Sequence, residues 1–520
     1  MRALTGFHLK GEGRKKGRPL VCQFIFAASI LGLVSLGILG CRIEAPTASG
    51  ELIAQSLEVA PTHGRYLVLF SAEQVPSDFG NRIASLGGSV EASLDGIGVA
   101  VATGLTEAAA AELAVSAGVQ SVEHDPIVSM EDDSVETAEA STEQFPTDTL
   151  VAANETGLPQ EAKYYKRQWN MRAVFADQAW AAGYLGSRDV VVAILDTGID
   201  YEHPDLKGLV DTDRSKSFVP EENPTIENLY PGRLPISDLN WHGTAAASIV
   251  SSNAILLAGI NRDVTLLAVK VADRFQNGSA CRLIAGIVYA ADQGADVISI
   301  SRGHEYDKNK IEDRGMVAAF ERAANYAFRK GSLIVSLPFN DAADLDHNGE
   351  KVRMPCEAAH VICVSATAPT GASGMEGPWV AVDARATRTL AVAGPYSGFG
   401  YSAIDVAAPG GAGAGIQTLH TKVWLPCTTT PSEGTPPTGP MSCNTSVPID
   451  MRLGRGVGTS FSVPHVAGLA ALLVAQLGHG NPALIRARIL HSADDLGEPG
   501  TDPYYGKGRI NVARALGLIN

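Results

Sequence analysis

The sequence predicts an α/β protein whose main domain is a parallel sheet with helices on both faces, preceded by a small α+β unit. Two observations lead to this fold class. In residues 161–520, runs rich in Val, Ile and Leu alternate with helical segments, a pattern typical of strands buried on both faces of a parallel sheet. In residues 65–130 the expected order of elements is β-α-β-β-α-β, which is typical of a ferredoxin-like unit.

The strands expected in the larger domain are continuous apolar runs: Val190–Leu195, Val264–Val271, Val297–Ser301, Ser332–Leu337, Val361–Ala366 and Ile404–Ala407. The expected helices are Ala280–Gln293, Gly315–Lys330, Ser460–Gln476 and Pro482–Ser492. In such sheets the chemistry gathers at the carboxyl ends of the strands. The stretch 410–456 is rich in Gly, Pro and Thr, which predicts a surface insertion.

The smaller unit begins with the apolar run Tyr66–Phe70 and ends with one strand expected over 119–130. Between them we expect helices near 78–86 and 106–117 and two strands within 88–102. Residues 131–160 are acidic, polar and nearly free of large apolar side chains. They are therefore expected to form an exposed linker.

The amino terminus predicts export from the cell. Residues 1–20 carry six basic residues and one acid, and the apolar run 21–40 follows, a pattern typical of a signal peptide. Because the run ends in Ile-Leu-Gly before Cys41, it resembles a bacterial lipoprotein signal with lipid attached to Cys41. A plainly cleaved signal and an uncleaved membrane anchor remain open. Residues 41–64 form a linker, and we expect an extracellular or cell-envelope protein of a bacterium.

Composition excludes some classes of function. The 520 residues carry a net charge of −15, with 45% hydrophobic and 19% charged residues. This is ordinary for a folded globular protein of two or three domains. The acidic balance argues against binding of nucleic acid, which favours a basic surface.

Seven cysteines are present, two of them in the amino-terminal segment. Cys427 and Cys443 bracket a loop, so we expect them to pair, and Cys356 and Cys363 are a second candidate pair for an exported protein. Cys281 is left over and is expected to be a buried small hydrophobe. The spacings do not form a zinc motif.

Three segments carry residues suited to chemistry. Asp196 follows the apolar run 190–195, His242 opens a helix of small residues, and Ser460 starts an apolar helix with Pro464 expected in its first turn. Taken singly, each has a structural explanation: a turn-capping Asp, a structural His and a Ser N-cap. Their order and flanking residues give the combination more weight than any single segment.

Together the segments resemble the subtilisin-like serine proteases, or subtilases, over about residues 165–515. The matching motifs are D-T-G-I-D-x-x-H-P-D-L at 196–206, H-G-T at 242–244 and G-T-S-x-x-x-P-H-V-A-G at 458–468, together with VICVSAT at 361–367 and IDVAAPG at 404–410. The resemblance implies that Ser460 is the nucleophile, that His242 takes and returns its proton, and that Asp196 orients the imidazole. It also implies a subtilisin-like fold.

The resemblance implies an oxyanion donor as well. Asn340 matches the side-chain amide of the family, although Phe339 stands where Gly is usual and Pro338 precedes it. The substrate would add as a strand beside an edge segment that Ser301, Arg302 and Gly303 match, with Leu337 and Phe339 also in the cleft. For Arg302 two interpretations stay open: contact with acidic groups of the substrate, or an ordinary solvated side chain.

Calcium and a prodomain are further implications of the resemblance. Gln168, Asp205 and Asn253 match positions that bind a structural calcium ion in many members, whereas the chemistry requires no cofactor. Residues 65–130 resemble the inhibitor-like prodomain, which would act as an intramolecular inhibitor and be cut off within 131–165.

The expected function is therefore that of a secreted serine endopeptidase, monomeric, self-processed and acting on proteins or peptides. The alternative is a subtilase-like binding or scaffold protein that no longer turns over, which Phe339 would favour. A pepsin-like protease needs two catalytic carboxylates, and the chain has a single D-T-G and no D-S-G. An α/β-hydrolase needs G-x-S-x-G, and G-T-S-F-S at 458–462 does not fit.

Overall fold

A computed structural model gives the fold of the chain. It describes residues 64–129, 157–369, 384–385, 396–411, 421–430 and 453–520. These residues belong to one compact unit. The export segment, Cys41 and nearly all of the acidic linker lie outside the described residues.

The amino-terminal unit has the predicted β-α-β-β-α-β order. Its elements are β1 (Gly64–Phe70), α1 (Phe79–Ser85), β2 (Ser89–Leu94), β3 (Val99–Leu105), α2 (Glu107–Ala114) and β4 (Val119–His124). The strands pair in the order β2-β3-β1-β4, antiparallel throughout. Thr106 starts α2 by accepting a hydrogen bond from the Ala109 amide at 3.2 Å, as an N-cap does.

The last predicted strand of this unit, 119–130, is split in two, so that prediction was wrong. β4 ends at His124, and a separate strand β5 (Val128–Ser129) pairs antiparallel with β9 (Asn277–Gly278). Pro126 lacks the N–H that a continued ladder needs. Asp125 instead turns its side chain to the start of α7, where the Cys281 amide donates to it at 3.1 Å.

The main domain is built on seven parallel strands, and the predicted fold class is confirmed. The strands are β6 (Val191–Asp196), β7 (Lys216–Ser217), β8 (Thr265–Lys270), β10 (Val297–Ile300), β12 (Leu333–Ser336), β14 (Ile362–Ala368) and β16 (Val406–Pro409). The order across the sheet is β14-β12-β10-β6-β8-β7, with β16 paired to β14 and the short antiparallel β15 (Ala384–Arg385) also beside β14.

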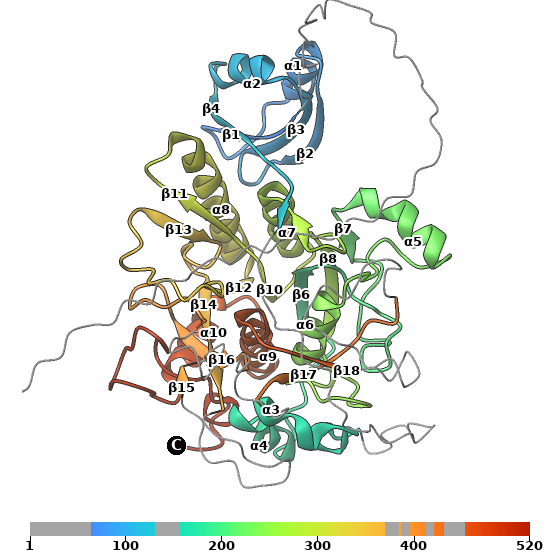
Figure 1. Cartoon of the computed structure of the whole chain (residues 1–520), viewed down its shortest axis with the longest axis vertical. Helices are drawn as coiled ribbons and strands as arrows, with labels where there is room; N and C mark the ends of the chain where they lie inside the picture. Colours follow the sequence, from blue (N-terminus) through green and yellow to red (C-terminus); the bar gives the residue numbers. More distant parts are fainter. Residues whose placement is uncertain (1–63, 130–156, 370–383, 386–395, 412–420, 431–452) are drawn as a thin grey trace, which may run out of the picture. The chain divides into compact units, whose positions relative to one another are not determined.

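Two layers of helices cover the sheet (Figure 1). α6 (His242–Val250) and α9 (Thr459–Leu477) lie on one face, and α7 (Ala280–Asp292) and α8 (Ile311–Lys330) lie on the other. Side chains of β6 alternate between the layers: Val192 and Ile194 join the α6–α9 core, and the residues between them join the α7–α8 core. The same alternation directs Asp196, the last residue of β6, toward α6 and α9.

Shorter elements complete the main domain. They are α3 (Trp169–Ala173), α4 (Ala176–Ala181), α5 (Asn223–Leu229), α10 (Pro482–His491), α11 (Val512–Ala515), the hairpin of β11 (His304–Asp307) with β13 (Lys351–Met354), and the hairpin of β17 (Val423–Pro426) with β18 (Leu453–Gly456). Short 3-10 turns lie at Pro159–Glu161, Tyr165–Arg167 and Pro220–Glu222.

The hairpin of β17 and β18 corrects one expectation. The stretch 410–456 was predicted to be a surface insertion, but both strands are buried, and Trp424 is only 2% exposed. The Gly/Pro/Thr-rich composition concealed the short apolar run 423–425, which packs beneath α6. The other residues of that stretch, 412–420 and 431–452, lie outside the described residues.

α9 is apolar on all sides because it is the central buried helix. It is long and apolar enough to cross a membrane, yet most of it is buried inside the fold, as expected for a core helix. Because the helix begins at Thr459, Pro464 lies beyond its first turn, contrary to prediction. Proline has no N–H to give to the carbonyl four residues earlier, so the Ser460 carbonyl lacks its usual helical partner.

The cysteine predictions are confirmed where they fall on described residues. Cys356 and Cys363 form a disulfide, and Cys281 is a buried free thiol. Cys427 is disulfide-bonded as well; Cys443, its expected partner, lies outside the described residues.

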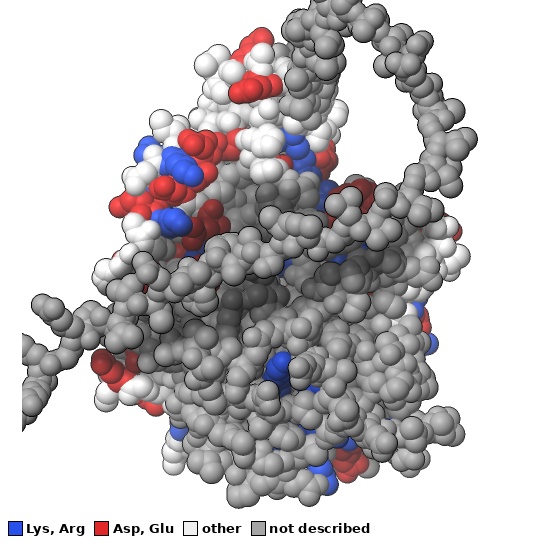
Figure 2. All heavy atoms as spheres, in the orientation of Figure 1, with Lys and Arg blue, Asp and Glu red and all other residues white. Residues whose placement is uncertain are grey.

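Charges are mixed on the face drawn in Figure 2. Acidic and basic side chains lie side by side over the described surface.

The amino-terminal unit packs on the layer of α7 and α8. Arg322 of α8 donates to the carbonyls of Phe70 and Ile97 at 2.8 and 3.1 Å. Glu123 of β4 lies against Gly315 near the start of α8 and is 5% exposed. Burial raises the pKa of Glu123 to about 7, although hydrogen bonds from Ser121 and the Gly315 amide oppose the change.

We expect this contact to weaken as the pH rises. The raised pKa means that the contribution of the protonated Glu123 is complete below its ordinary pKa of 4.5 and is lost as the pH passes about 7. The test compares full-length Ser460→Ala with the same chain carrying Glu123→Gln in addition. The melting temperature of the Glu123→Gln chain should gain on the order of 2–5 °C over its parent as the pH rises from 5 to 8. Glu112→Gln, at an exposed carboxylate of α2, is the control. If the melting temperatures of all three chains changed equally with pH, the raised pKa of Glu123 would be contradicted.

Candidate active site

Asp196 and His242 form a buried carboxylate–imidazole pair. His242 Nδ1 lies 2.9 Å from both carboxylate oxygens of Asp196, and the two residues are 0% and 1% exposed. Asp196 ends β6, and His242 opens α6, which packs on the same face of the sheet. The Thr197 amide donates to Asp196 Oδ1 at 2.7 Å and helps to fix the carboxylate at the end of the strand.

A second buried carboxylate, missed by the sequence analysis, holds the start of α6. Asp238 accepts hydrogen bonds from the amides of Trp241 and Thr244, both at 2.9 Å, and from the Thr197 hydroxyl at 3.0 Å. It therefore connects the loop after β6 to the helix that carries His242. Asp238 stands four residues before the helix, outside the N-cap and first-turn positions where a capping acid is common, so the sequence carried no local signal for it.

The third predicted residue, Ser460, stands near the amino terminus of α9. α9 packs on α6, and the ring of Phe461 lies 5.6 Å from the ring of His242. The Ser301 hydroxyl donates to the Ser460 carbonyl at 2.7 Å, which supplies the partner that Pro464 withholds. Ser301 follows β10, the strand next to β6. The three predicted triad residues thus come from β6, α6 and α9 at one end of the sheet.

Asn340 is oriented toward the same helix start. Its Oδ1 accepts hydrogen bonds from the Thr459 amide at 2.9 Å and the Thr459 hydroxyl at 3.0 Å, and the side chain is buried. Since the oxygen is fixed by the residue before Ser460, the amide group of Asn340 lies close to that serine. This is the surrounding that an oxyanion donor requires.

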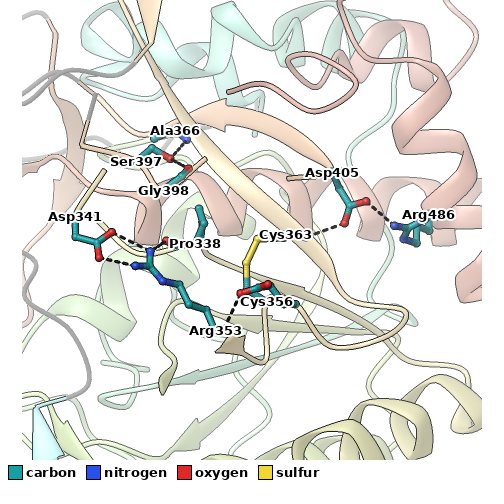
Figure 3. Close-up of a disulfide and its surroundings, with 11 residues drawn as sticks. Pro338, Asp341, Arg353, Cys356, Cys363, Ala366, Ser397, Gly398, Asp405 and Arg486 are labelled. Carbon is teal, nitrogen blue, oxygen red and sulfur yellow. Dashed lines mark hydrogen bonds and ion pairs between the residues drawn. A yellow bond between two sulfur atoms is a disulfide. The ribbon is translucent and has the colours of Figure 1, made fainter. Parts of the chain in front are cut away.

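Arg353 clamps the turn that carries Asn340. It donates to both carboxylate oxygens of Asp341 and to the Pro338 carbonyl (Figure 3). The turn follows β12 in the chain. The Cys356–Cys363 disulfide ties the segment after β13 to β14 beside it. The side chain of Arg353 is 1% exposed, whereas that of Asp341 is 54% exposed, so the clamp reaches from the interior to the surface.

Phe339 adopts the conformation that explains why glycine is usual there. Its φ is 66°, in the left-handed region, which costs energy for a bulky residue. The ring lies 4.9 Å from the Arg353 guanidinium and against Gly303. Phe339 is half-buried and Leu337 is buried in the core. Of the predicted cleft residues, Phe339 therefore has a partly accessible side chain, whereas Ser301 and Leu337 are buried.

Arg302 is neither solvated nor turned toward a substrate, so both interpretations were wrong. Its side chain is 1% exposed and folds back on the triad residues, with Nη2 3.1 Å from Asp196 Oδ1. Burial by itself would raise the pKa of Asp196. Arg302 and His242 outweigh that effect and hold the pKa of Asp196 well below its usual range.

Comparison with known proteins identifies the family. The profile of the subtilase family matches residues 187–508. The chain belongs to the subtilase family. It is 31% identical to thermitase of Thermoactinomyces vulgaris over 363 residues, which cover 69% of this chain and 99% of thermitase. It is 30% identical to a thermophilic serine proteinase of Bacillus sp. strain AK1 over 366 residues, 70% of each chain.

Solved structures agree with this subtilase fold. The crystal structure of the epidermin leader peptide processing serine protease of Staphylococcus aureus matches with a TM-score of 0.62 and 21% identity, covering 88% of this chain and 99% of that one. A lanthipeptide protease matches with a TM-score of 0.53 and 25% identity over 69% of this chain and 96% of that one. The chain is thus a subtilisin-like serine protease, a hydrolase.

The three residues expected to bind calcium meet at one loop but do not fit the ion. Asp205 accepts hydrogen bonds from the amides of residues 255, 256 and 257 at 2.8–3.1 Å. Gln168 uses both amide atoms on the backbone of Ala258, and Asn253 donates to the carbonyls of Pro204 and Lys207. Calcium needs six to eight oxygens directed at one point, whereas here N–H groups surround the carboxylate. Nor do the described residues hold any group of three or more His, Cys, Asp or Glu that suits a metal.

We therefore expect the Asp205 loop to be stable without calcium. Asp205→Ala leaves three buried N–H groups without an acceptor, so the free energy of unfolding should fall by at least about 2 kcal/mol. Denaturant titration should give the same loss in excess calcium and in excess chelator, with Asp213→Ala, a change at an exposed carboxylate, as the control. A calcium-dependent stabilisation that disappears in Asp205→Ala would show that the loop binds the ion after all.

Proposed function

We propose that this subtilase is an exported, self-processed endopeptidase that cleaves proteins through an acyl-enzyme. The observation that carries the proposal is the buried contact between Asp196 and His242, 2.9 Å long, beside the helix that carries Ser460. A serine hydroxyl is a weak nucleophile until a base removes its proton. The arrangement supplies that base next to a serine in the first turn of a helix.

The reaction follows from these positions. Ser460 attacks the carbonyl carbon of the scissile bond while His242 takes the hydroxyl proton, and His242 then gives this proton to the leaving amine. Asp196, ionised and held by Thr197, keeps the Nδ1–H of the imidazole toward itself and stabilises the imidazolium. The side-chain amide of Asn340 and the backbone amide of Ser460 donate to the oxyanion. Water then attacks the acyl carbonyl while His242 takes its proton, and His242 gives this proton to the Ser460 oxygen as the carboxylic acid leaves.

The alternative is a subtilase-like binding protein without turnover. Phe339, with its φ of 66° and its ring against Gly303, is the feature that favours it. The hydrogen bonds from Thr459 to Asn340 and the clamp from Arg353 speak for an amide that remains in place despite Phe339. We therefore place the endopeptidase first.

A fluorophosphonate probe decides between the two. We expect stoichiometric labelling of the peptide that contains Ser460, and loss of labelling by at least about a thousandfold in Ser460→Ala. The matched control is Ser462→Ala on the same helix, because the Ser462 hydroxyl is buried and donates to the Ala408 carbonyl instead. Equal labelling of the wild-type chain and Ser460→Ala, or none in either, would favour the binding protein.

Self-processing is supported by the position of β5. This strand adds antiparallel to β9, beside the loop whose Gln276 carbonyl faces Arg302 at 3.5 Å. A chain added to an exposed edge in this way occupies the place of a bound peptide. Residues 65–130 then act as the prodomain: the ferredoxin-like unit packs on α7 and α8, and its carboxyl end covers the cleft.

We expect the cut early in the acidic linker, within about ten residues of Ser129, because an extended strand spans about 3.3 Å per residue and β5 is already at the cleft. Mass spectrometry of the mature chain should find its amino terminus within 130–140. Full-length Ser460→Ala, which cannot cut itself, is the control and should stay intact. A mature amino terminus beyond residue 150 would contradict this position.

Export rests on residues 1–40, which lie outside the described residues. We propose a signal peptide that ends before Cys41, with lipid on Cys41 as the first interpretation and plain cleavage or an uncleaved anchor as the others. The mass of the amino-terminal fragment distinguishes them, since a lipid-modified Cys41, an unmodified new terminus and a retained apolar run each give a different mass. We further propose that the enzyme acts as a monomer on proteins or peptides.

A further inference from the structure

Arg302 brings a third charge to the carboxylate–imidazole pair. Its Nη2 and Nε lie 3.1 and 3.4 Å from Asp196 Oδ1, and Nη2 lies 3.5 Å from His242 Nδ1. The residue stands two positions after β10, the strand that pairs with β6, and its side chain turns back over the strand ends. The guanidinium therefore contacts the acid directly and reaches the base.

The fold does not need this guanidinium to satisfy Asp196. The carboxylate already accepts hydrogen bonds from His242 and from the Thr197 amide. Removing one partner of a buried ion pair usually lowers stability, and these two remaining hydrogen bonds offset part of that loss. Because a loss of stability is expected whatever the role of Arg302, that role has to be identified from the chemistry of the pair.

Other charges surround the pair at a greater remove. The Lys270 ammonium donates to the Thr197 carbonyl and pairs with Glu222 at 2.8 Å, while Asp238 accepts from the Thr197 hydroxyl. The Asp200 carboxylate accepts hydrogen bonds from Arg233 and Thr429, and the Asp200 amide donates to the Thr244 hydroxyl of α6. His465 of α9 bonds Asn170 and the Phe461 carbonyl. The contacts that these groups make are with neighbours of the pair, whereas Arg302 contacts the carboxylate itself.

We propose that Arg302 is a positioning residue that fixes the Asp196 carboxylate and keeps His242 uncharged, and thus able to act as a base, at a lower pH than the acid and imidazole alone would allow. This inference rests on the proposed triad chemistry. Two effects have the same sign. The guanidinium repels the imidazolium, and it offsets part of the negative charge with which Asp196 would stabilise that imidazolium.

The same interaction has a cost at higher pH. The imidazolium forms during the attack, so a nearby cation also opposes the transition state. Arg302 is expected to extend activity toward acid while lowering the maximum rate. Removing the charge should therefore have opposite effects at the two ends of the pH range, which a side chain with a merely structural role would not produce.

The test uses the rate of fluorophosphonate labelling of Ser460 as a function of pH, because this rate needs no knowledge of the substrate. In Arg302→Met, the acid limb of this curve, where the labelling rate falls as the pH is lowered, should lie about one pH unit higher, and the maximum labelling rate at higher pH should increase. Arg302→Lys, which retains the charge, should leave the limb within a few tenths of a unit. The control is Arg509→Met, which removes another buried arginine, paired with Asp494 at 3.0 Å, and should leave the limb unchanged.

A folded, labelled Arg302→Met with an unmoved limb would overturn the proposal. A second measurement does not depend on activity or on that variant. In full-length Ser460→Ala, the proton resonances of the His242 ring should titrate about one pH unit higher when Arg302→Gln is added, and equal midpoints would also overturn it. If the wild-type chain is not labelled at all, the proposed function fails, whereas the His242 titration still decides the role of Arg302.

Discussion

The contact between Asp196 and His242 is the interaction on which the site depends. A carboxylate with 1% exposure and an imidazole with none are costly to bury unless each satisfies the other. The fold meets this requirement with two simple devices. Strand alternation along β6 turns Asp196 toward the α6–α9 layer, and Asp238 fixes the start of α6 so that His242 faces it.

The remaining parts of the site follow from the same end of the sheet. β10 is hydrogen-bonded to β6, so the residues that follow it, Ser301 and Arg302, reach Ser460 and Asp196. Because Pro464 has no N–H to donate to the Ser460 carbonyl, that carbonyl accepts the hydrogen bond from Ser301 instead. The turn after β12 adds Asn340. Thr459 donates to its side-chain oxygen, and Arg353 holds the turn through Pro338 and Asp341. The residues proposed for the triad and the oxyanion site are thus supported by contacts from the segments that follow β6, β10 and β12.

The sequence predicted the elements well because their signals are local. The apolar strands and the helices of the main domain lie within a few residues of their expected bounds, and the motifs around 196 and 242 identified the carboxylate and the imidazole that contact each other. What it could not predict is the direction of single side chains and backbone groups. Nothing local says that Arg302 folds back to a neighbouring strand end, or that the loop at 255–257 presents N–H groups rather than carbonyls to Asp205. Pro126, by contrast, was a local signal for the break between β4 and β5.

Direct observation of the acyl-enzyme tests the central claim that these side chains act together on a peptide carbonyl. The wild-type chain would be mixed with an activated peptide ester, quenched on the millisecond scale and analysed by mass spectrometry of its peptides. The account predicts a single acyl group on the peptide that contains Ser460, formed before free product accumulates and lost as the substrate is consumed. Hydrolysis of the ester with no acyl group on that peptide would contradict it.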